Sequence, residues 1–296
     1  MWNPRCGFAM RIDIKGFARS LSIDAYGASY EVVVKYVLGM FLKFLHRHKD
    51  AAPWVELFRE VLRAKRFLLI VLDGARYDVF RRMYRRYLRG ILCKAFVPPP
   101  HTYGWLPKAF SLPEFDHVRV FYASLGIVTH DIRIKDFIPR GRDVEIYVVK
   151  PSKLKEIGTV LPFEVNNVVR RVGLRGRDIV WYVQPHFPWV CDPELSLMLM
   201  RDVLIHDYVP PDTVRRTLKK YGISRERVLR AYCCNMEVAL RGVRDLLEYI
   251  HTVGLKYDRI VVTSDHGELL GEYGLYLHQE YDLPQLTVVP WLEVEL

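Results

Sequence analysis

Two segments far apart in the sequence each consist of an apolar run that ends in side chains able to bind a metal. The first, FLLIVLDGARYD, occupies residues 67–78 and places Asp73 directly after the apolar run. The second, RIVVTSDHGE, occupies residues 259–268 and places Asp265 beside His266. Apolar runs of this kind are typical of strands buried on both faces, and ligands of open α/β sheets bind at the carboxyl ends of such strands. Carboxylate and imidazole groups brought together there would bind a divalent cation.

A hydroxyl group in the loop PPPHTYGWL, residues 98–106, is the candidate nucleophile. A hydroxyl beside a divalent cation loses its proton more easily, so Thr102 would attack at neutral pH without a histidine base. The structural alternatives are that an Asp after a strand caps a helix and that Thr102 caps a turn. The adjacent Asp265 and His266 have no obvious structural role, which favours the chemical interpretation. The expected metal ligands are therefore Asp73, Thr102, Asp265 and His266.

Strand-like and helix-like segments alternate along the chain, and this order predicts the fold class. Strands are expected at residues 67–73, 93–97, 118–124, 144–149, 178–184, 258–265 and 286–296, and helices at 54–62, 75–89, 162–172 and across most of 193–251. This order is typical of an α/β domain with a mostly parallel central sheet covered by helices on both faces. Residues 65–296 should form this catalytic domain, and residues 1–64 an N-terminal helical extension. The strands that carry Asp73 and Asp265 should lie close together.

The formal net charge of +10 is unevenly distributed. Residues 61–90 carry nine Lys and Arg against two Asp, whereas residues 258–296 carry one Arg against eight Asp and Glu. Helical spacing places one set of arginines opposite the apolar side chains of the 75–89 helix: Arg81, Arg82, Arg85, Arg86 and Arg89. These arginines form either a solvated helix face or a surface for anions or nucleic acid. No specific nucleic-acid motif accompanies them.

Composition and the N-terminal sequence bear on the compartment. The five cysteines form no CxxC, so neither a disulfide framework nor a zinc ribbon is indicated. Asn and Gln together number seven, a low share typical of thermophile proteins. The N-terminus lacks the apolar stretch of a signal peptide. Residues 32–45 would be about 21 Å long as a helix, too short to span a bilayer, and form either a buried helix or an interfacial membrane helix. We expect a cytoplasmic protein, with peripheral membrane association left open.

Several motifs taken together resemble the sulfatase-like branch of the alkaline phosphatase superfamily. They are IVLDGARYD, the HT of PPPHTYGWL, QPHFPW and SDHGELLGEYGLYLH, and they lie in this order within about residues 66–296. The resemblance implies a three-layer αβα fold and a metal-dependent hydrolase or transferase of phosphate or sulfate esters that works through a covalent intermediate. It implies that Thr102 is the nucleophile and shares one metal with the two Asp and the His at the strand ends. His186 would contact the transferred group, and His278 would bind a second metal or donate to the substrate.

The chain also departs from this family pattern. True sulfatases carry a C/S-x-P-x-R signature, which is absent here, and Thr102 instead resembles the nucleophile of phosphoglycerol and phosphoethanolamine transferases. Those enzymes usually carry transmembrane helices, which we do not expect in this chain. The Asp-x-x-x-His of a second metal site is missing, with only Gln184, His186 and Asp192 nearby. We therefore expect one tightly bound divalent ion, Zn, Mn, Mg or Ca, with a second left open. The substrate would be a phosphate or sulfate ester, free or linked to a glycan or lipid.

The roles of four further residues are less specific. Arg76 either contacts the substrate as a catalytic group or forms a salt bridge to Asp78. His101 either orients the loop of the nucleophile or is an ordinary exposed histidine. Glu268 and Glu272 are expected to support the ligands or begin a helix rather than to bind the metal. A catalytically inactive member of the superfamily and a nucleic-acid-binding protein are the alternatives to an enzyme.

Overall fold

The computed structural model describes residues 50–98, 100–124, 134–151, 157–203, 213–278 and 282–295. All of them belong to one compact unit, His46–Leu296. The helices expected before residue 50, including the apolar segment 32–45, lie outside the described residues. Among the helices that the structure describes, none is long and apolar enough to cross a bilayer.

The centre of this unit is an eight-stranded sheet in the order β1-β3-β10-β7-β2-β6-β4-β5. Its strands are β1 (Ala51–Pro53), β2 (Phe67–Leu72), β3 (Gly90–Phe96), β4 (Val118–Ala123), β5 (Val144–Val149), β6 (Arg177–Tyr182), β7 (Arg259–Thr263) and β10 (Val288–Val294). Neighbouring strands in this sheet are parallel except at β10, which runs antiparallel to both β3 and β7. The prediction of a mostly parallel sheet is confirmed, and so is the prediction that the strands carrying Asp73 and Asp265 lie close together, since β2 and β7 pair directly.

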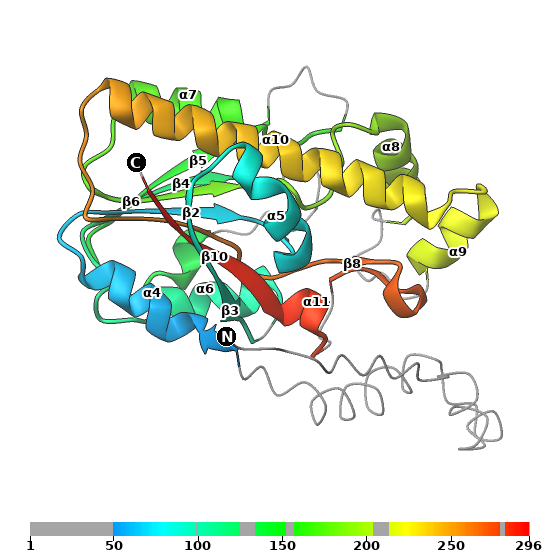
Figure 1. Ribbon diagram of the computed structural model, residues 1–296, viewed down its shortest axis with the longest axis horizontal. Coiled ribbons are helices and arrows are strands. Elements are labelled where there is room, and N and C mark those ends of the chain that lie inside the picture. Colours follow the sequence, from blue (N-terminus) through cyan, green and yellow to red (C-terminus); the bar gives the residue numbers. More distant parts are fainter. Residues whose placement is uncertain are drawn as a thin grey trace, which may run out of the picture. The chain divides into compact units, whose positions relative to one another are not determined.

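Helices cover both faces of the sheet because its central strands are apolar on both faces (Figure 1). In β2, Leu68 and Ile70 pack in a core shared with α5 (Tyr77–Met83), α7 (Pro162–Val172) and α10 (Arg225–Thr252). Leu69 and Val71 pack in a second core shared with α4 (Trp54–Arg63) and α6 (Thr102–Phe110). The result is the three-layer αβα arrangement that the sequence predicts.

The remaining elements lie in the connections. They are α8 (Pro193–Asp202), α9 (Thr213–Lys220), α11 (Pro284–Thr287), the 3₁₀ turns η3 (Tyr84–Arg86), η4 (Ile134–Phe137) and η5 (Glu272–Gly274), and a two-stranded sheet of β8 (Leu269–Leu270) and β9 (Tyr276–Leu277). The small sheet follows β7 directly and carries the residues after His266 away from the main sheet.

Helix α10, at 28 residues, is capped by Ser224, whose side chain accepts a hydrogen bond from the Arg227 backbone N–H at 3.3 Å. It packs closely on α7, because a Cβ at Gly242 would lie 2.2 Å from the Cβ of Pro162. Eleven of its residues are buried, which fixes the helix firmly over the sheet. Consequently α10 is a rigid support for whatever it contacts.

The basic helix is shorter than the sequence predicts. Instead of running from 75 to 89, α5 ends at Met83 and tightens into the 3₁₀ turn η3. The chain must enter β3 at Gly90, where a Cβ would lie 2.0 Å from the Glu293 carbonyl oxygen, so little room remains for a longer helix. The predicted faces are nevertheless correct: Phe80 and Tyr84 are buried, whereas the five arginines are exposed, namely Arg81, Arg82, Arg85, Arg86 and Arg89.

A disulfide that the sequence does not indicate joins Cys191 to Cys234, with the two Cα atoms 6.1 Å apart. The sequence indicated no disulfide framework, and the structure has this one bond among its described residues. The two residues are 43 positions apart, and spacing alone carries no information about which distant cysteines the fold brings together. The bond ties the loop after β6 to α10.

Candidate active site

Four side chains that the sequence singles out lie together at the carboxyl ends of β2 and β7. Asp73 follows β2, Asp265 and His266 follow β7, and Thr102 is the first residue of α6. The Thr102 hydroxyl donates a hydrogen bond to Oδ2 of Asp265 at 2.6 Å and lies 3.4 Å from Nε2 of His266. That Nε2 atom is also 3.4 Å from Oδ1 of Asp73. We call Asp73, Asp265 and His266 the first ligand group.

The ring of His266 is oriented so that a lone pair points at this group. Its Nδ1 lies 2.8 Å from the Gly267 carbonyl oxygen, to which it donates, so Nε2 carries no proton in the neutral ring. An unprotonated nitrogen facing two carboxylates and a hydroxyl oxygen is a cluster of electron-pair donors. Such a cluster is suited to a cation.

Burial governs the ionisation of the first ligand group, since its residues are at most 3% exposed. Burial raises the pKa of Asp73 well above its ordinary value, and the charges of Asp265 and Glu268 raise it further. Burial raises the pKa of Asp265 as well, although the hydrogen bond from Thr102 opposes this. Burial lowers the pKa of His266 well below its ordinary value. Without a cation, burial therefore favours the uncharged forms of these carboxyl groups and of the imidazole.

Hydrogen bonds between the two strand ends hold the first ligand group together. The Ser264 hydroxyl accepts from the Ala75 N–H at 2.8 Å and donates to the His266 carbonyl oxygen at 2.5 Å. The Gly74 N–H donates to Oδ1 of Asp265 at 3.3 Å. The loop after β2 and the loop after β7 are thus joined directly, which fixes the spacing of the carboxylates they carry.

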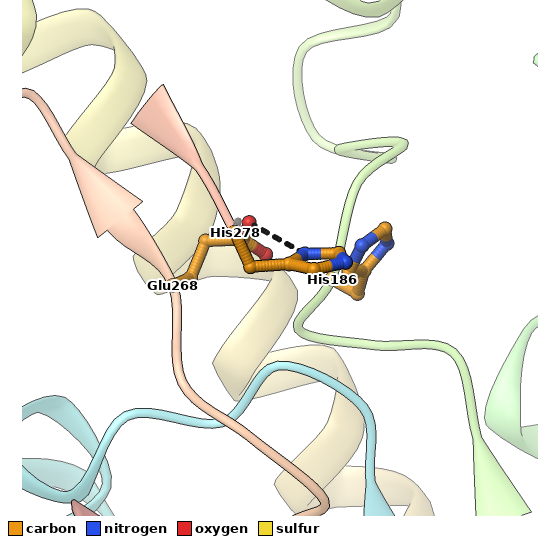
Figure 2. Close-up of side chains that lie close together, drawn as sticks. All are labelled: His186, Glu268 and His278. Atoms are coloured by element: carbon orange, nitrogen blue, oxygen red, sulfur yellow. Dashed lines mark hydrogen bonds and ion pairs between the residues drawn. The ribbon is translucent and has the colours of Figure 1, made fainter. Parts of the chain in front are cut away.

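A second ligand group lies beside the first and consists of His186, Glu268 and His278 (Figure 2). His186 comes from the loop after β6, Glu268 immediately precedes β8, and His278 follows β9. One ligand atom from each lies within 4.8 Å of the others. Oε1 of Glu268 is 3.4 Å from Nδ1 of His278, whereas its buried Oε2 has no hydrogen-bond partner among the described residues.

The second ligand group has the same electrostatic character as the first. Burial raises the pKa of Glu268 to about 7, although the charges of His186 and Arg76 oppose this. Burial lowers the pKa of His278 to about 4 and also lowers that of His186. His186 Nδ1 donates to the Phe187 carbonyl oxygen, so its Nε2 presents a lone pair. These neutral imidazoles are suited to ligating a cation.

The two ligand groups form one continuous cluster. The ring centroids of His266 and His278 are 4.1 Å apart, and those of His186 and His266 are 6.1 Å apart. The His186 N–H donates to the Asp73 carbonyl oxygen at 3.0 Å. Gly74 is required at this junction, because it has φ +67° and a Cβ there would lie 2.9 Å from Oε2 of Glu268.

The donor atoms of both groups fit divalent cations. Asp73 Oδ1 and Glu268 Oε2 are buried without a hydrogen-bond partner within the described residues, and leaving such atoms unpaired is costly. Carboxylate oxygens and imidazole nitrogens are ligands of Zn²⁺, which would satisfy both orphaned oxygens. The residues present therefore fit one ion in the first group and a second ion in the second.

The Arg76 side chain is buried and paired with carboxylates outside the two ligand groups. Its side chain pairs with both carboxylate oxygens of Asp78 at 2.9 Å and with Oε1 of Glu272 at 2.8 Å. It also donates to the Glu268 carbonyl oxygen at 3.3 Å. Of the two interpretations from sequence, the structure has the salt bridge to Asp78, and a contact between Arg76 and the substrate stays a prediction. Glu272 supports Arg76, as expected of a carboxylate outside the ligand set.

His101 is the N-cap of α6, and its Nδ1 accepts a hydrogen bond from the Gly104 N–H at 3.0 Å. This is the loop-orienting role rather than that of an ordinary exposed histidine. The cap places Thr102 in the first turn of α6, where the free N–H groups of a helix carry partial positive charge. That charge favours a negative Thr102 oxygen.

The sequence predicts that Glu268 lies outside the ligand set, but the structure groups it with two histidines, His186 and His278. The available signal was its position two residues after His266 in a segment that continues apolar, which predicts burial. The sequence places Asp192 near a candidate second metal site. In the structure Asp192 instead caps α8 and pairs with Arg227 at 2.7 Å. Gln184 donates to Thr159 and is not in either ligand group.

Comparison with known proteins gives structural similarity only. No family model and no curated protein matches the chain. The C-terminal periplasmic domain of EcEptC from Escherichia coli, in complex with Zn, has 12% identity and a TM-score of 0.50 over 78% of this chain and 73% of that chain. A 2-O GAG sulfatase has 14% identity and a TM-score of 0.51 over 79% of this chain and 65% of that chain, so the chain spans less than two thirds of its length.

A third structure, BT4656 in complex with its substrate D-glucosamine-2-N,6-O-disulfate, has 11% identity and a TM-score of 0.51 over 78% of this chain and 71% of that chain. Identities this low establish a shared fold and leave the activity open. The resemblance inferred from the motifs is confirmed at that level. The chain therefore shares the fold of the EcEptC domain, the 2-O GAG sulfatase and BT4656.

Proposed function

We propose that this protein is a metal-dependent enzyme that hydrolyses or transfers phosphate or sulfate esters, with Thr102 as the nucleophile. The observation that supports this most is the position of the Thr102 hydroxyl. It lies 2.6 Å from Asp265 and 3.4 Å from the unprotonated Nε2 of His266, inside a buried cluster of ligand atoms. A structural threonine that only caps a helix would have no need of these neighbours.

The chain's own residues prepare Thr102 for attack. The Thr102 hydroxyl already donates its proton toward Oδ2 of Asp265, so the proton has an acceptor when the oxygen attacks phosphorus or sulfur. The first turn of α6 stabilises negative charge on that oxygen. A divalent cation held by Asp73, Asp265 and His266 would lower the pKa of the hydroxyl and offset charge on the transferred group. The attack forms a Thr102 ester and releases the alcohol part of the substrate.

The second ligand group lies where the transferred group would be positioned. This ligand group offers two imidazoles and one carboxylate, from His186, His278 and Glu268. The lone pair on His186 Nε2 and the orphaned Oε2 of Glu268 favour a cation here over a direct hydrogen bond from His186 to the substrate. Water, or an acceptor alcohol, would then cleave the Thr102 ester and complete hydrolysis or transfer.

Zn²⁺ is the metal that the donor set favours. Two imidazoles in one group and one in the other are typical of zinc, whereas Mg²⁺ and Ca²⁺ prefer oxygen ligands throughout. The complex of EcEptC with Zn supports the same choice. The sulfated glucosamine bound by BT4656 and the name of the 2-O GAG sulfatase make glycan esters a substrate class to test first. Phosphodiesters are the alternative that the Thr nucleophile suggests.

A trapping experiment tests the proposal. The zinc-loaded protein would be mixed with chromogenic phosphodiester, phosphomonoester and sulfate ester substrates, quenched, digested and searched by mass spectrometry for an adduct on residues 98–107. Thr102→Ala should retain bound zinc, form no adduct and lose at least about 10³-fold in kcat, and Thr102→Ser should retain partial activity. Thr217→Ala, the same change at a buried position on α9, serves as the control. Full activity in Thr102→Ala, or an adduct on Ser264, would contradict the covalent role.

A further inference from the structure

One turn of α10 contacts the loops that carry both ligand groups. Tyr232 and Asn235 are fully buried and are three residues apart on this helix. Residues at that spacing lie on the same face of a helix. Neither side chain is in a ligand group, and the sequence pattern around them indicates burial alone.

Tyr232 holds the loop after β2. Its hydroxyl donates to the Gly74 carbonyl oxygen at 2.7 Å and accepts from the Arg76 N–H at 2.9 Å. Both backbone groups belong to the turn that begins at Asp73, so the hydroxyl spans the turn and fixes its shape. The phenol has no second role, because both its donor and its acceptor capacity are used on this turn.

Asn235 holds the loop after β6. Its Nδ2 donates to the carbonyl oxygens of Pro188 at 3.0 Å and His186 at 3.1 Å, and its Oδ1 accepts from the Val190 N–H at 2.8 Å. One side chain thus satisfies backbone groups along the whole turn that presents the His186 ring. The disulfide from Cys234, the residue before Asn235, reaches the same loop at Cys191.

We infer that Tyr232 and Asn235 are positioning residues that set the separation of the two ligand groups from a single turn of α10. The inference rests on the proposed function, because it assigns these residues to the metal site. Two ions act together on one ester only when their separation is held within narrow limits. Here one group is carried by the β2 and β7 loops, and His186 of the other by the β6 loop. A common support on one rigid helix fixes the distance between them.

The inference differs from a general stabilising role in what it predicts for each variant. Tyr232→Phe removes the contacts to the β2 loop and should weaken zinc at the first ligand group. Asn235→Ala removes the contacts to the β6 loop and should weaken zinc at the second group alone. Groups outside the ligand set that orient ligands typically contribute 10–100-fold to metal affinity, so we expect about a tenfold loss in each case.

The measurements are zinc titration against a chelating indicator, zinc content per chain, and amide hydrogen exchange of the metal-free protein. Hydrogen exchange of the Arg76 amide should accelerate at least about tenfold in Tyr232→Phe, and that of the Val190 amide should accelerate equally in Asn235→Ala. Each variant should leave the other amide unchanged. kcat should fall in both with KM little changed, because the ligands move rather than the substrate contacts.

Matched controls come from one buried and one half-buried hydrogen bond elsewhere in the same fold. Asn166→Ala removes a side chain on α7 that donates to the Gly242 carbonyl oxygen at 2.9 Å. Tyr257→Phe removes a hydroxyl that donates to Asp178 at 2.9 Å. Both should lower stability and leave zinc affinity unchanged. If Asn235→Ala does not fold, Asn235→Ser, which leaves a smaller cavity and one hydroxyl, replaces it.

Zinc affinities of Tyr232→Phe and Asn235→Ala within about twofold of the controls would overturn the inference. So would equal weakening of both ligand groups by each variant, which is the result of general loosening. If the natural protein takes up no zinc, the proposed function fails and the amide exchange decides alone. Unchanged exchange at Arg76 and Val190 would then overturn the inference as well.

Discussion

Replacing Glu268 by Gln should make the metal-free protein more stable at alkaline pH, although it removes a candidate ligand. Glu268 is fully buried, and burial raises the pKa of its carboxyl group to about 7 from an ordinary 4.5. A carboxyl whose pKa is higher in the folded than in the unfolded state lowers stability once it ionises. This cost is absent below about pH 4.5, grows as pH rises to about 7, and is constant above, where it reaches about 3 kcal/mol.

Glu268→Gln keeps the shape of the side chain and removes the ionisation. Urea unfolding of the chelator-treated proteins should therefore show equal stability near pH 4.5 and an advantage for Glu268→Gln of up to about 3 kcal/mol at pH 8. Comparing variant with natural protein at each pH cancels the titration of carboxyl groups far from Glu268. The charge of Glu268 raises the pKa of Asp73, so its removal lowers that pKa and adds to the advantage of the variant at alkaline pH. Zinc in large excess should reverse the order, since binding at the second ligand group at about 1,000 times Kd stabilises the natural protein by about 4.1 kcal/mol.

A neighbouring glutamate provides a control of opposite sign. Burial pushes the pKa of Glu272 upward, but the charge and hydrogen bond of Arg76 outweigh this and hold it below its ordinary value. Its stabilising effect is present at neutral pH and lost as the carboxyl is protonated in acid. Glu272→Gln should thus be less stable than the natural protein at pH 8. A Glu268→Gln variant that is also less stable there without metal would refute the electrostatic account of the second ligand group.

Three further predictions concern the ligands and the disulfide. Asp265→Asn should reduce zinc affinity more than about 100-fold and leave the circular dichroism spectrum unchanged. This loss exceeds the roughly 10–100-fold loss of affinity that follows from mutating residues outside the ligand set. His278→Ala should lower the zinc content by one of two ions per chain; unchanged content would exclude a second ion held there. Reducing the Cys191–Cys234 bond, which closes a loop of 43 residues, should lower the free energy of unfolding by about 4 kcal/mol, whereas an unchanged denaturation midpoint would show that the bond does not form.

The main features of the fold were predictable because they depend on local pattern. FLLIVL must be covered on both faces, and this requirement, repeated along the chain between helical segments, yields helices on each side of a parallel sheet. The pairing of β2 with β7 followed from chemistry rather than pattern, since Asp73 and Asp265 needed to meet. The end of α5 was not predictable, because it depends on how closely Gly90 approaches β10.

The candidate site was predictable where a ligand lies at a strand end. Asp73, Asp265 and His266 follow apolar runs, so their location could be inferred without knowing the packing. Glu268 reaches the second ligand group only through a turn that leaves the sheet, and Asn235 lies in the middle of a long helix whose pattern shows burial but not its neighbours. The role of Glu268 depends on the path of that turn, and the role of Asn235 depends on which loops the helix covers. Both are properties of the tertiary structure.

The ionisation of the cluster explains why its residues belong together. Burial raises the pKa values of Asp73, Asp265 and Glu268 and lowers those of His266 and His278, so every one of these groups is driven toward its uncharged form. A divalent cation has the opposite effect on the carboxyl groups, because it favours their charged, deprotonated form. It binds imidazole in the neutral form, which burial already favours. The cluster thus lowers the stability of the folded protein without metal and raises it when metal is bound. Zinc binding should therefore release protons from the carboxyl groups, which links ion uptake to both pH and stability.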